Sequence, residues 1–500
     1  MKKVLTYIIC ISLIFNLFIS TSSSLNFKKE KSMIFEDYDP LLDINLTIDI
    51  QAIRALDKID LFSDPDFFLK VYINDEEFKS QVWKDTKNIY DCWSFATDVP
   101  DDIENVKIKI ELWDSNLIRD KICDISSERN NDNSGYSLDI IYNIKTGIWS
   151  GDDYNIGDSS GYGRGCGSGD GSIYNNENDC EIFFNIYQND YDKDGLPYWI
   201  ETSVYGTDPK INNIGEDYDY DNIPIEWEHR WGFNPLIWDD HENFDPDSDS
   251  LNNTEEFITS IFGTDPYRKD IFLEIDYMAY ENNSAQIEIF KKAGEIVKNP
   301  YHRRNIIFHL DIGMVDGGEE IPNDNESSFE ELLELYQNYF VHNGEQNWKR
   351  GIFHYALIVD YCRPAGYGFS GDVYPHWGYN PGTNSFVLSK DLIERKSDLV
   401  KKSDEYIFAY LFMHELGHNF GIRFGNPLGC DLRGTSNPLR PSYWIFRNYK
   451  SVMNYRYTYF VLDYSDGSHG KRDFDDWENI DLTWFEYVNS DSVKKLLIFT

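Results

Sequence analysis

The chain has 500 residues, of which 41% are hydrophobic and 16% aromatic, so it can bury several cores and is not globally disordered. Asp and Glu total 87 against 46 Lys and Arg, which gives a net charge of −41. Such a negative field repels phosphate backbones, so we expect no nucleic-acid partner. It suits a very soluble protein or one that binds cations, and the patterned carboxylates described below favour cation binding.

Residues 1–24 have the layout of a secretory signal peptide. Lys2 and Lys3 precede an apolar run from Val4 to Ile19, and small residues follow. We therefore predict a protein that is secreted or held on the extracellular surface. An uncleaved anchor helix is the alternative, because the apolar run is only slightly short for a membrane span.

Six cysteines lie beyond this segment, and an even number in an exported chain indicates disulfides. Each predicted domain holds an even number of them. We therefore favour the pairs Cys92–Cys123, Cys166–Cys180 and Cys362–Cys430.

Residues 34–188 are predicted to form an antiparallel β-sandwich. Apolar residues alternate with others in runs that are separated by turn residues, which is typical of half-buried strands. The runs are LTIDIQAI (46–53), FFLKVYI (67–73), VKIKIELW (106–113) and EIFFNIY (181–187).

Two segments of this region, SDPDFFLKVYI and IELWDSN, resemble the calcium-dependent lipid-binding β-sandwiches of synaptotagmin and protein kinase C. The resemblance implies a calcium-bridged contact with lipid. Its acidic loop positions correspond to Asp60, Asp64, Asp114 and Asp120. The first loop is shortened and Asn116 replaces a usual aspartate, so solvated loop aspartates on a generic sandwich are the alternative.

Residues 189–267 contain three copies of an acidic repeat: DYDKDGLPYWIE from residue 190, DYDYDNIPIEWE from 217 and DPDSDSLNNTEE from 245. Each copy has Asp at positions 1, 3 and 5 and Glu at position 12, which are carboxylate positions of an EF-hand-type calcium loop. We predict about three structural calcium ions, with an acidic surface linker as the alternative. The predicted ligands are Asp190, Asp192, Asp194, Glu201, Asp217, Asp219, Asp221, Glu228, Asp245, Asp247, Asp249 and Glu256.

The segments between these loops are too short for full helix pairs. The repeats therefore resemble thrombospondin type 3 or dockerin-like calcium repeats more than paired EF-hands. Position 6 requires a sharp turn, which Gly195 permits, Asn222 tolerates and Ser250 suits less well.

Residues 268–500 are predicted to form an α/β domain, because strand-like and helix-like runs alternate. A helix is expected from about Asp404 to Phe420. His414 and His418 are four residues apart, so both imidazoles lie on one helix face and could reach one zinc ion. Glu415 could then take a proton from a metal-bound water. The alternative is a hydrogen-bonded pair of core histidines.

HELGH (414–418), together with SVMNYRY (451–457), resembles the metzincin metallopeptidases. The resemblance implies one catalytic zinc ion, Glu415 as general base, Met453 beneath the histidines and Tyr455 near the transition-state oxyanion. It also implies a protein or peptide substrate. The superfamily places its third ligand where this chain has Phe424, which cannot bind zinc. We predict Asp431 as the third ligand; Cys430, His376 and His469 remain alternatives.

These observations predict a multidomain α+β protein: an antiparallel β-sandwich, a calcium-loop repeat segment and a C-terminal α/β metzincin-like catalytic domain. The expected function is that of a secreted, calcium-stabilised zinc metalloendopeptidase. The alternative is a catalytically inactive relative that acts as a calcium-dependent cell-surface adhesion or binding protein. Membrane contact is expected only through an uncleaved N-terminal anchor or calcium-bridged lipid.

Overall fold

The computed structural model describes residues 44–483, except 101–102, 128–135, 145–146, 154–162, 171–176, 280–282, 316, 323–333, 345–346, 363–365, 369–372, 375–377 and 380–384. The chain separates into units 1–43 and 44–500. The predicted signal peptide, residues 1–24, lies outside the described residues. Within the described part of the chain, no helix is both long and apolar enough to cross a membrane.

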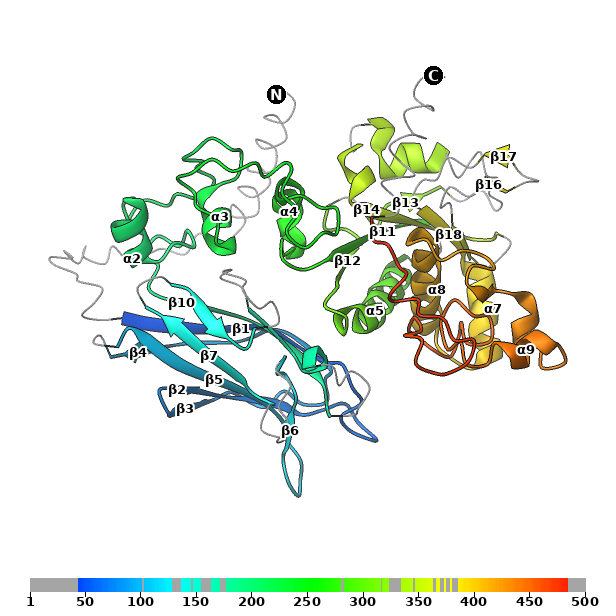
Figure 1. The fold of residues 1–500 in the computed structure, drawn as a ribbon, viewed down its shortest axis with the longest axis horizontal. Coiled ribbons are helices and arrows are strands. Elements are labelled where there is room, and N and C mark those ends of the chain that lie inside the picture. Colours follow the sequence, from blue (N-terminus) through cyan, green and yellow to red (C-terminus); the bar gives the residue numbers. More distant parts are fainter. Residues whose placement is uncertain are drawn as a thin grey trace. The chain divides into compact units, whose positions relative to one another are not determined.

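The N-terminal part of the described chain is an antiparallel β-sandwich (Figure 1). One sheet has the order β4-β1-β10-β9, with β1 at Ile44–Ala55, β4 at Asn88–Val99, β9 at Gly163–Cys166 and β10 at Cys180–Tyr187. The other has the order β3-β2-β5-β7-β8, with β2 at Phe67–Ile73, β3 at Glu76–Lys79, β5 at Asn105–Asp114, β7 at Leu138–Asn143 and β8 at Trp149–Gly151. Strand β6 (Lys121–Cys123) pairs with β5, and a 3₁₀ turn, η1, covers Gly167–Asp170.

The alternating sequence pattern explains the core of this sandwich. Along β1, buried residues alternate with half-buried ones, and Leu46, Ile48 and Ile50 face inward. Apolar residues from both sheets, including Leu69 and Ile110, join them in one core. The predicted sandwich and its four predicted strands are therefore confirmed.

Each acidic loop of the repeat segment leads into a short helix (Figure 1). The first loop is followed by α2 (Tyr198–Ile200) and the π-helical turn η2 (Glu201–Tyr205), the second by α3 (Ile225–Trp231), and the third by α4 (Asn253–Thr259) and η3 (Ser260–Phe262). Position 12 of each loop therefore falls at or inside the first helical turns. The predicted domain boundaries at residues 188 and 267 stay predictions.

The C-terminal part contains a mainly parallel sheet of order β12-β11-β14-β18-β15, in which β15 is antiparallel and β13 pairs with β11. Its strands are β11 (Asp270–Met278), β12 (Ile307–Asp311), β13 (Glu320–Ile321), β14 (Phe353–Val359), β15 (Gly366–Gly368) and β18 (Ser385–Ser389). A separate pair joins β16 (Val373–Tyr374) to β17 (Gly378–Tyr379). Strands β11, β14 and β18 are buried along their whole length, which is typical of strands covered on both faces. β14 and β18 are largely apolar, whereas β11 carries Asp270, Glu274 and Asp276 at buried positions.

Helices α5 (Asn283–His302), α7 (Lys390–Val400) and α8 (Asp404–Asn419) lie against this sheet (Figure 1). Asp404 and Glu405 occupy the first turn of α8, where carboxylates stabilise the helix dipole. The α/β prediction and the predicted helices at 284–299 and 404–420 are confirmed. The remaining elements are η4 (Tyr336–Phe340), η5 (His342–Gly344), η6 (Asn347–Gly351), β19 (Leu428–Asp431), η7 (Arg433–Ser436) and α9 (Pro441–Ile445).

The structure corrects the predicted disulfides. All six of these cysteines are buried and none of them is joined in a disulfide, so the predicted pairs Cys92–Cys123, Cys166–Cys180 and Cys362–Cys430 are not formed. Cys180 instead lies within hydrogen-bonding reach of Cys123. An even count per domain does not fix which cysteines meet, because each strand register sets its own neighbours.

Candidate metal-binding sites

The first aspartate closes each acidic loop onto its own backbone. Asp190 accepts hydrogen bonds from the N–H groups of Lys193 at 2.7 Å and Gly195 at 2.9 Å. The same two bonds recur in the other loops, from Tyr220 and Asn222 to Asp217, and from Ser248 and Ser250 to Asp245. The three copies therefore share one local geometry.

Position 6 adopts a left-handed backbone conformation in all three loops. The φ angle is 89° at Gly195, 81° at Asn222 and 82° at Ser250. Glycine adopts this conformation without steric cost, asparagine adopts it fairly often, and serine adopts it under strain. The turn expected from the sequence is thus present in every copy.

The glutamate at position 12 of each loop is buried with oxygen atoms that make no hydrogen bond. These atoms are Oε2 of Glu201 and both carboxylate oxygens of Glu228 and Glu256. A buried carboxylate oxygen without a partner is costly in free energy, and native proteins rarely keep one without a ligand or water. Three such glutamates at the same repeat position are therefore a specific indication of bound cations.

Burial and the neighbouring carboxylates raise the pKa values of these acids. The pKa is raised to about 6 at Asp192, to about 7 at Glu201, Glu228 and Asp249, and to about 10 at Asp247. Burial is the largest cause in each case, and repulsion between carboxylates adds to it. A bound divalent cation would lower these pKa values, because it stabilises the ionised carboxylates that surround it.

The structure brings the predicted calcium ligands together within loops and adds one residue that the sequence did not single out. Side-chain oxygens of Asp190, Asp192 and Asp194 lie within 4.8 Å of one another. In the second loop, the corresponding group consists of Asp221, Glu228 and His241. His241 lies twenty residues after Asp221, outside the repeat pattern, so periodicity could not identify it.

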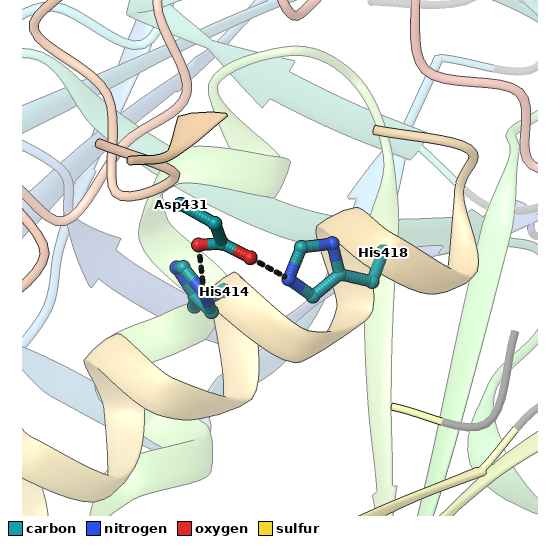
Figure 2. Close-up of side chains that lie close together, drawn as sticks. All are labelled: His414, His418 and Asp431. Atoms are coloured by element: carbon teal, nitrogen blue, oxygen red, sulfur yellow. Dashed lines mark ion pairs between the residues drawn. The ribbon is translucent and has the colours of Figure 1, made fainter. Parts of the chain in front are cut away.

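A second centre combines the predicted residues His414, His418 and Asp431 (Figure 2). Nε2 of His414 lies 3.1 Å from Asp431 Oδ1, and Nε2 of His418 lies 3.0 Å from Asp431 Oδ2. The other ring nitrogens face backbone carbonyls, at 2.9 Å from Val452 and 2.6 Å from Ile422. Both Nε2 atoms are thereby aimed at the carboxylate, as in sites that hold a metal.

The chain after α8 explains how Asp431 reaches the histidines. Gly421, with a φ of 93°, turns the backbone out of the helix. Strand β19 brings Asp431 back, and its N–H donates to the carbonyl of Met453 at 3.1 Å. Met453 also lies under the helix, because a Cβ built on Gly417 would stand 2.5 Å from the Met453 sulfur.

Without a metal, the two imidazoles and the Asp431 carboxylate stabilise one another in their charged forms. Burial lowers the pKa of both imidazoles, but Asp431 outweighs it, so the pKa of His418 rises to about 9 and that of His414 also rises. The two histidines in turn lower the pKa of Asp431. Imidazolium protons therefore occupy positions that a divalent metal could take.

The other predicted site residues are placed as follows. The Tyr455 ring stacks on His414 with centroids 6.0 Å apart, and Glu415 is buried beside the histidines. Cys430 is buried next to Asp431. His469 is not part of this cluster, because its Nδ1 pairs with Asp473 at 2.9 Å, and His376 lies outside the described residues.

At one end of the sandwich, two of the expected acidic loop residues face a lysine. Lys121 Nζ lies 2.7 Å from Asp60 Oδ1 and 3.6 Å from Asp114 Oδ2. Asp64 pairs with Lys87 at 3.0 Å instead, and Asp120 accepts a hydrogen bond from the backbone of Asn116. An ammonium group thus stands between Asp60 and Asp114.

The same two loops expose four large apolar side chains, which we call the apolar tip. Their relative exposures are 76% for Leu61, 99% for Phe62, 108% for Leu117 and 100% for Ile118. The loop bases are joined by a hydrogen bond from Ser115 N–H to the Asp66 carbonyl at 2.8 Å. Exposed apolar groups that cluster in this way commonly mark a docking surface.

No family model matches the chain, and no curated protein does either. Among solved structures, human GIVD cytosolic phospholipase A2 in complex with methyl gamma-linolenyl fluorophosphonate is 15% identical, with a TM-score of 0.19 over 29% of this chain and 17% of that chain. A C2 domain is 13% identical, with a TM-score of 0.19 over 29% of this chain and 97% of that chain. A C2 domain of plant extended synaptotagmin 1 is 11% identical, with a TM-score of 0.19 over 29% of this chain and 92% of that chain. These likenesses are too low to transfer a function.

The comparisons correct the metzincin interpretation. The structures named above are phospholipases A2 and C2 domains, and no metallopeptidase family model matches. The expected metzincin family, its zinc metallopeptidase activity and the thrombospondin type 3 assignment are wrong, so the implied peptide substrate and catalytic zinc lose their basis. The physical reason is that HELGH is short, and a buried helix can use it simply to gather polar side chains. Phe424, at the superfamily's third-ligand position, is 65% exposed.

Proposed function

We propose that the protein is an extracellular, calcium-dependent binding protein. The observation that carries this proposal is the common geometry of the three acidic loops, each with a buried position-12 glutamate that has unpaired oxygens. Calcium takes six to eight oxygen ligands at 2.3–2.6 Å, and alternating aspartates with one bidentate glutamate supply most of them. Calcium would neutralise the crowded carboxylates and hold the segment compact.

The apolar tip supports a lipid surface as the binding partner. Its four side chains are already exposed to solvent, so their insertion into lipid disrupts no protein core. Full burial of each side chain in lipid would contribute about 1.5–3 kcal/mol to the free energy of binding. Lys58 and Arg119, which are exposed in the same loops, complement anionic headgroups. The net charge of −41 opposes approach to an anionic membrane, and bound calcium reduces that repulsion.

Vesicle sedimentation with the purified full chain tests this proposal. We expect the protein to sediment with phosphatidylcholine vesicles that contain phosphatidylserine, more strongly in calcium than in EGTA. The double variant Phe62→Ser with Leu117→Ser should lose most of this binding. Leu439→Ser is the matched control, because Leu439 is 90% exposed elsewhere and its loss should change nothing. Equal binding by the double variant would refute the docking surface.

We also propose that His414, His418 and Asp431 hold one zinc ion. Two imidazole nitrogens and a carboxylate oxygen form a donor set that suits zinc. The support is geometric, since both Nε2 atoms already lie 3.0–3.1 Å from the carboxylate. In the extracellular binding protein proposed here, the ion would join α8 to β19.

A further inference from the structure

His241 is buried inside the second acidic loop. Its Nε2 atom lies 3.1 Å from Asp221 Oδ2 and 3.8 Å from Glu228 Oε1. His241 is 1% exposed and Glu228 is fully buried. The segment between the second and third loops thus folds back and places an imidazole against the carboxylates of the second.

The atoms that face this point have no hydrogen-bond partners of their own. His241 Nε2 and both carboxylate oxygens of Glu228 make no hydrogen bond. Asp221, by contrast, is fixed, because its two oxygens accept from the N–H groups of Ile223 at 3.0 Å and Asp239 at 3.2 Å. Buried polar atoms that converge without partners indicate a ligand at their centre.

The surroundings of the imidazole hold Nε2 toward the loop. Trp227 and Phe233 pack against the ring at interplanar angles of 88° and 89°. On the other side, Nδ1 lies 2.8 Å from the side-chain amide of Asn253, whose Oδ1 makes no hydrogen bond. A half-turn of that amide lets Oδ1 accept from Nδ1–H, which leaves the Nε2 lone pair free for a metal.

The first and third loops have no histidine at the position that corresponds to His241. In each loop, the aspartate at position 5 accepts from a backbone N–H farther along the chain, which belongs to Asn213, Asp239 and Asp270 in turn. Two residues after these donors the chain has Gly215 in the first loop, His241 in the second and Phe272 in the third, so only the second loop gains an imidazole there. Asn213 has a buried, unbonded Oδ1, and Asp270 has a buried carboxylate. His309 near the third loop pairs with Asp270, which is not one of the loop's repeat positions.

We propose that the second loop is a mixed nitrogen and oxygen site, in which His241 Nε2 joins Asp221 and Glu228 to bind zinc in preference to calcium. Calcium is bound almost entirely by oxygen, whereas imidazole is an ordinary ligand of zinc and other first-row transition metals. Three ligand groups from the protein, with Asp217 and Asp219 nearby in the same loop, suffice for a zinc site. The inference deepens the proposed function, because it assigns a different metal to one of the three loops.

Metal counting on the full-length protein tests this inference. The protein would be dialysed in calcium with limiting zinc, and both metals would be measured by inductively coupled plasma mass spectrometry. We expect about two zinc and about two calcium ions per chain. His241→Asn replaces the imidazole with an oxygen donor, so it should lose about one zinc ion and gain about one calcium ion.

His418→Asn provides the matched comparison, because it removes a histidine from the other centre. Its remaining zinc, about one ion, must then come from the second loop, which keeps the test decisive if His241→Asn fails to fold. Three calcium ions in the wild type, with zinc unchanged in His241→Asn, would overturn the inference and show that His241 only pairs with Asp221. A wild-type protein that binds no calcium would instead count against the proposed function itself.

Discussion

Lys121 Nζ lies 2.7 Å from the Asp60 carboxylate and thereby joins the two loops that carry the apolar tip. The hydrogen bond to Asp60 is the largest cause that raises the pKa of Lys121, so the ammonium stays charged. Because its partner Asp114 is fully buried, the ammonium also compensates a carboxylate that water does not reach.

Replacement of this ammonium should make vesicle binding by the apolar tip depend more strongly on calcium than it does in the wild type. Lys121→Gln keeps most of the side-chain length but leaves Asp60 and Asp114 to repel each other. We expect vesicle binding in EGTA to fall several-fold, because the loops separate, and millimolar calcium to restore it by taking the place of the ammonium. Lys107→Gln, on the solvent face of β5, serves as the control. Lys121→Gln protein that binds vesicles normally in EGTA would show that the salt bridge does not organise the tip.

Calcium removal should loosen the repeat segment. Each site at one hundred times its dissociation constant contributes about 2.7 kcal/mol to the free energy of unfolding. We therefore expect EGTA to lower the melting temperature and to direct limited proteolysis to residues 190–266. Melting curves and cleavage patterns that do not change with EGTA would mean that the loops are acidic linkers.

The Glu256 carboxylate should destabilise the calcium-free protein and stabilise the calcium-bound protein. Burial, and then the charges of Asp270 and Asp249, raise its pKa, so its charge is unfavourable without calcium. Glu256→Gln should therefore stabilise the calcium-free protein and reduce the gain that calcium gives. Glu242→Gln, an exposed carboxylate outside the loops, should do neither. Thermal unfolding of both variants with and without calcium measures this; a Glu256→Gln protein that gains full stabilisation from calcium would exclude Glu256 as a ligand.

Position 6 offers a matched pair of backbone substitutions. No atom lies within 4 Å of a Cβ built on Gly195, so Gly195→Ala adds only the strain of a φ of 89°. Ser250→Gly removes the same kind of strain. We expect the first to weaken calcium binding about fivefold and the second to strengthen it about as much, since such strain costs about 1 kcal/mol. Calcium titration by isothermal calorimetry decides this, and changes of equal sign would contradict it.

The parts of the fold that were predictable are those set by local pattern. Alternation predicted β1, β2, β5 and β10 because one side of each strand faces the core. The carboxylate spacing predicted the acidic loops because their ligands lie within twelve consecutive residues. Asp431 could be suggested as well, because glycines and proline in the preceding stretch indicated a chain reversal.

The parts that could not be predicted depend on tertiary neighbours. His241 joins the second loop through packing against Trp227 and Phe233, which no spacing rule contains. Lys121 stands between two carboxylates from different loops, and the thiols of Cys123 and Cys180 meet across strands. The family assignment failed for the converse reason, since HELGH is a local pattern with no information about the rest of the domain.

Zinc binding at α8 should depend on Asp431. Asp431 accepts from both imidazoles, so Asp431→Ala removes one ligand and leaves two histidines that cannot form a strong site alone. Asp431→Asn keeps the shape but loses the charge. We expect zinc affinity, measured by competition with a chelating dye, to fall at least tenfold in both variants, and further in Asp431→Ala.

His469→Ala provides the control for Asp431, because His469 pairs with Asp473 and not with the α8 cluster. Its zinc affinity should equal that of the wild type. His376→Ala is expected to behave in the same way. Since the second loop is proposed to bind zinc independently, all of these variants are best compared in a His241→Asn background, where one zinc site remains. Zinc that survives loss of Asp431 but disappears with His469→Ala or His376→Ala would show that the replaced histidine, and not Asp431, is the third ligand. If the His241→Asn protein binds no zinc at all, the α8 cluster is stabilised by ion pairs between the protonated imidazoles and Asp431 and is not a metal site.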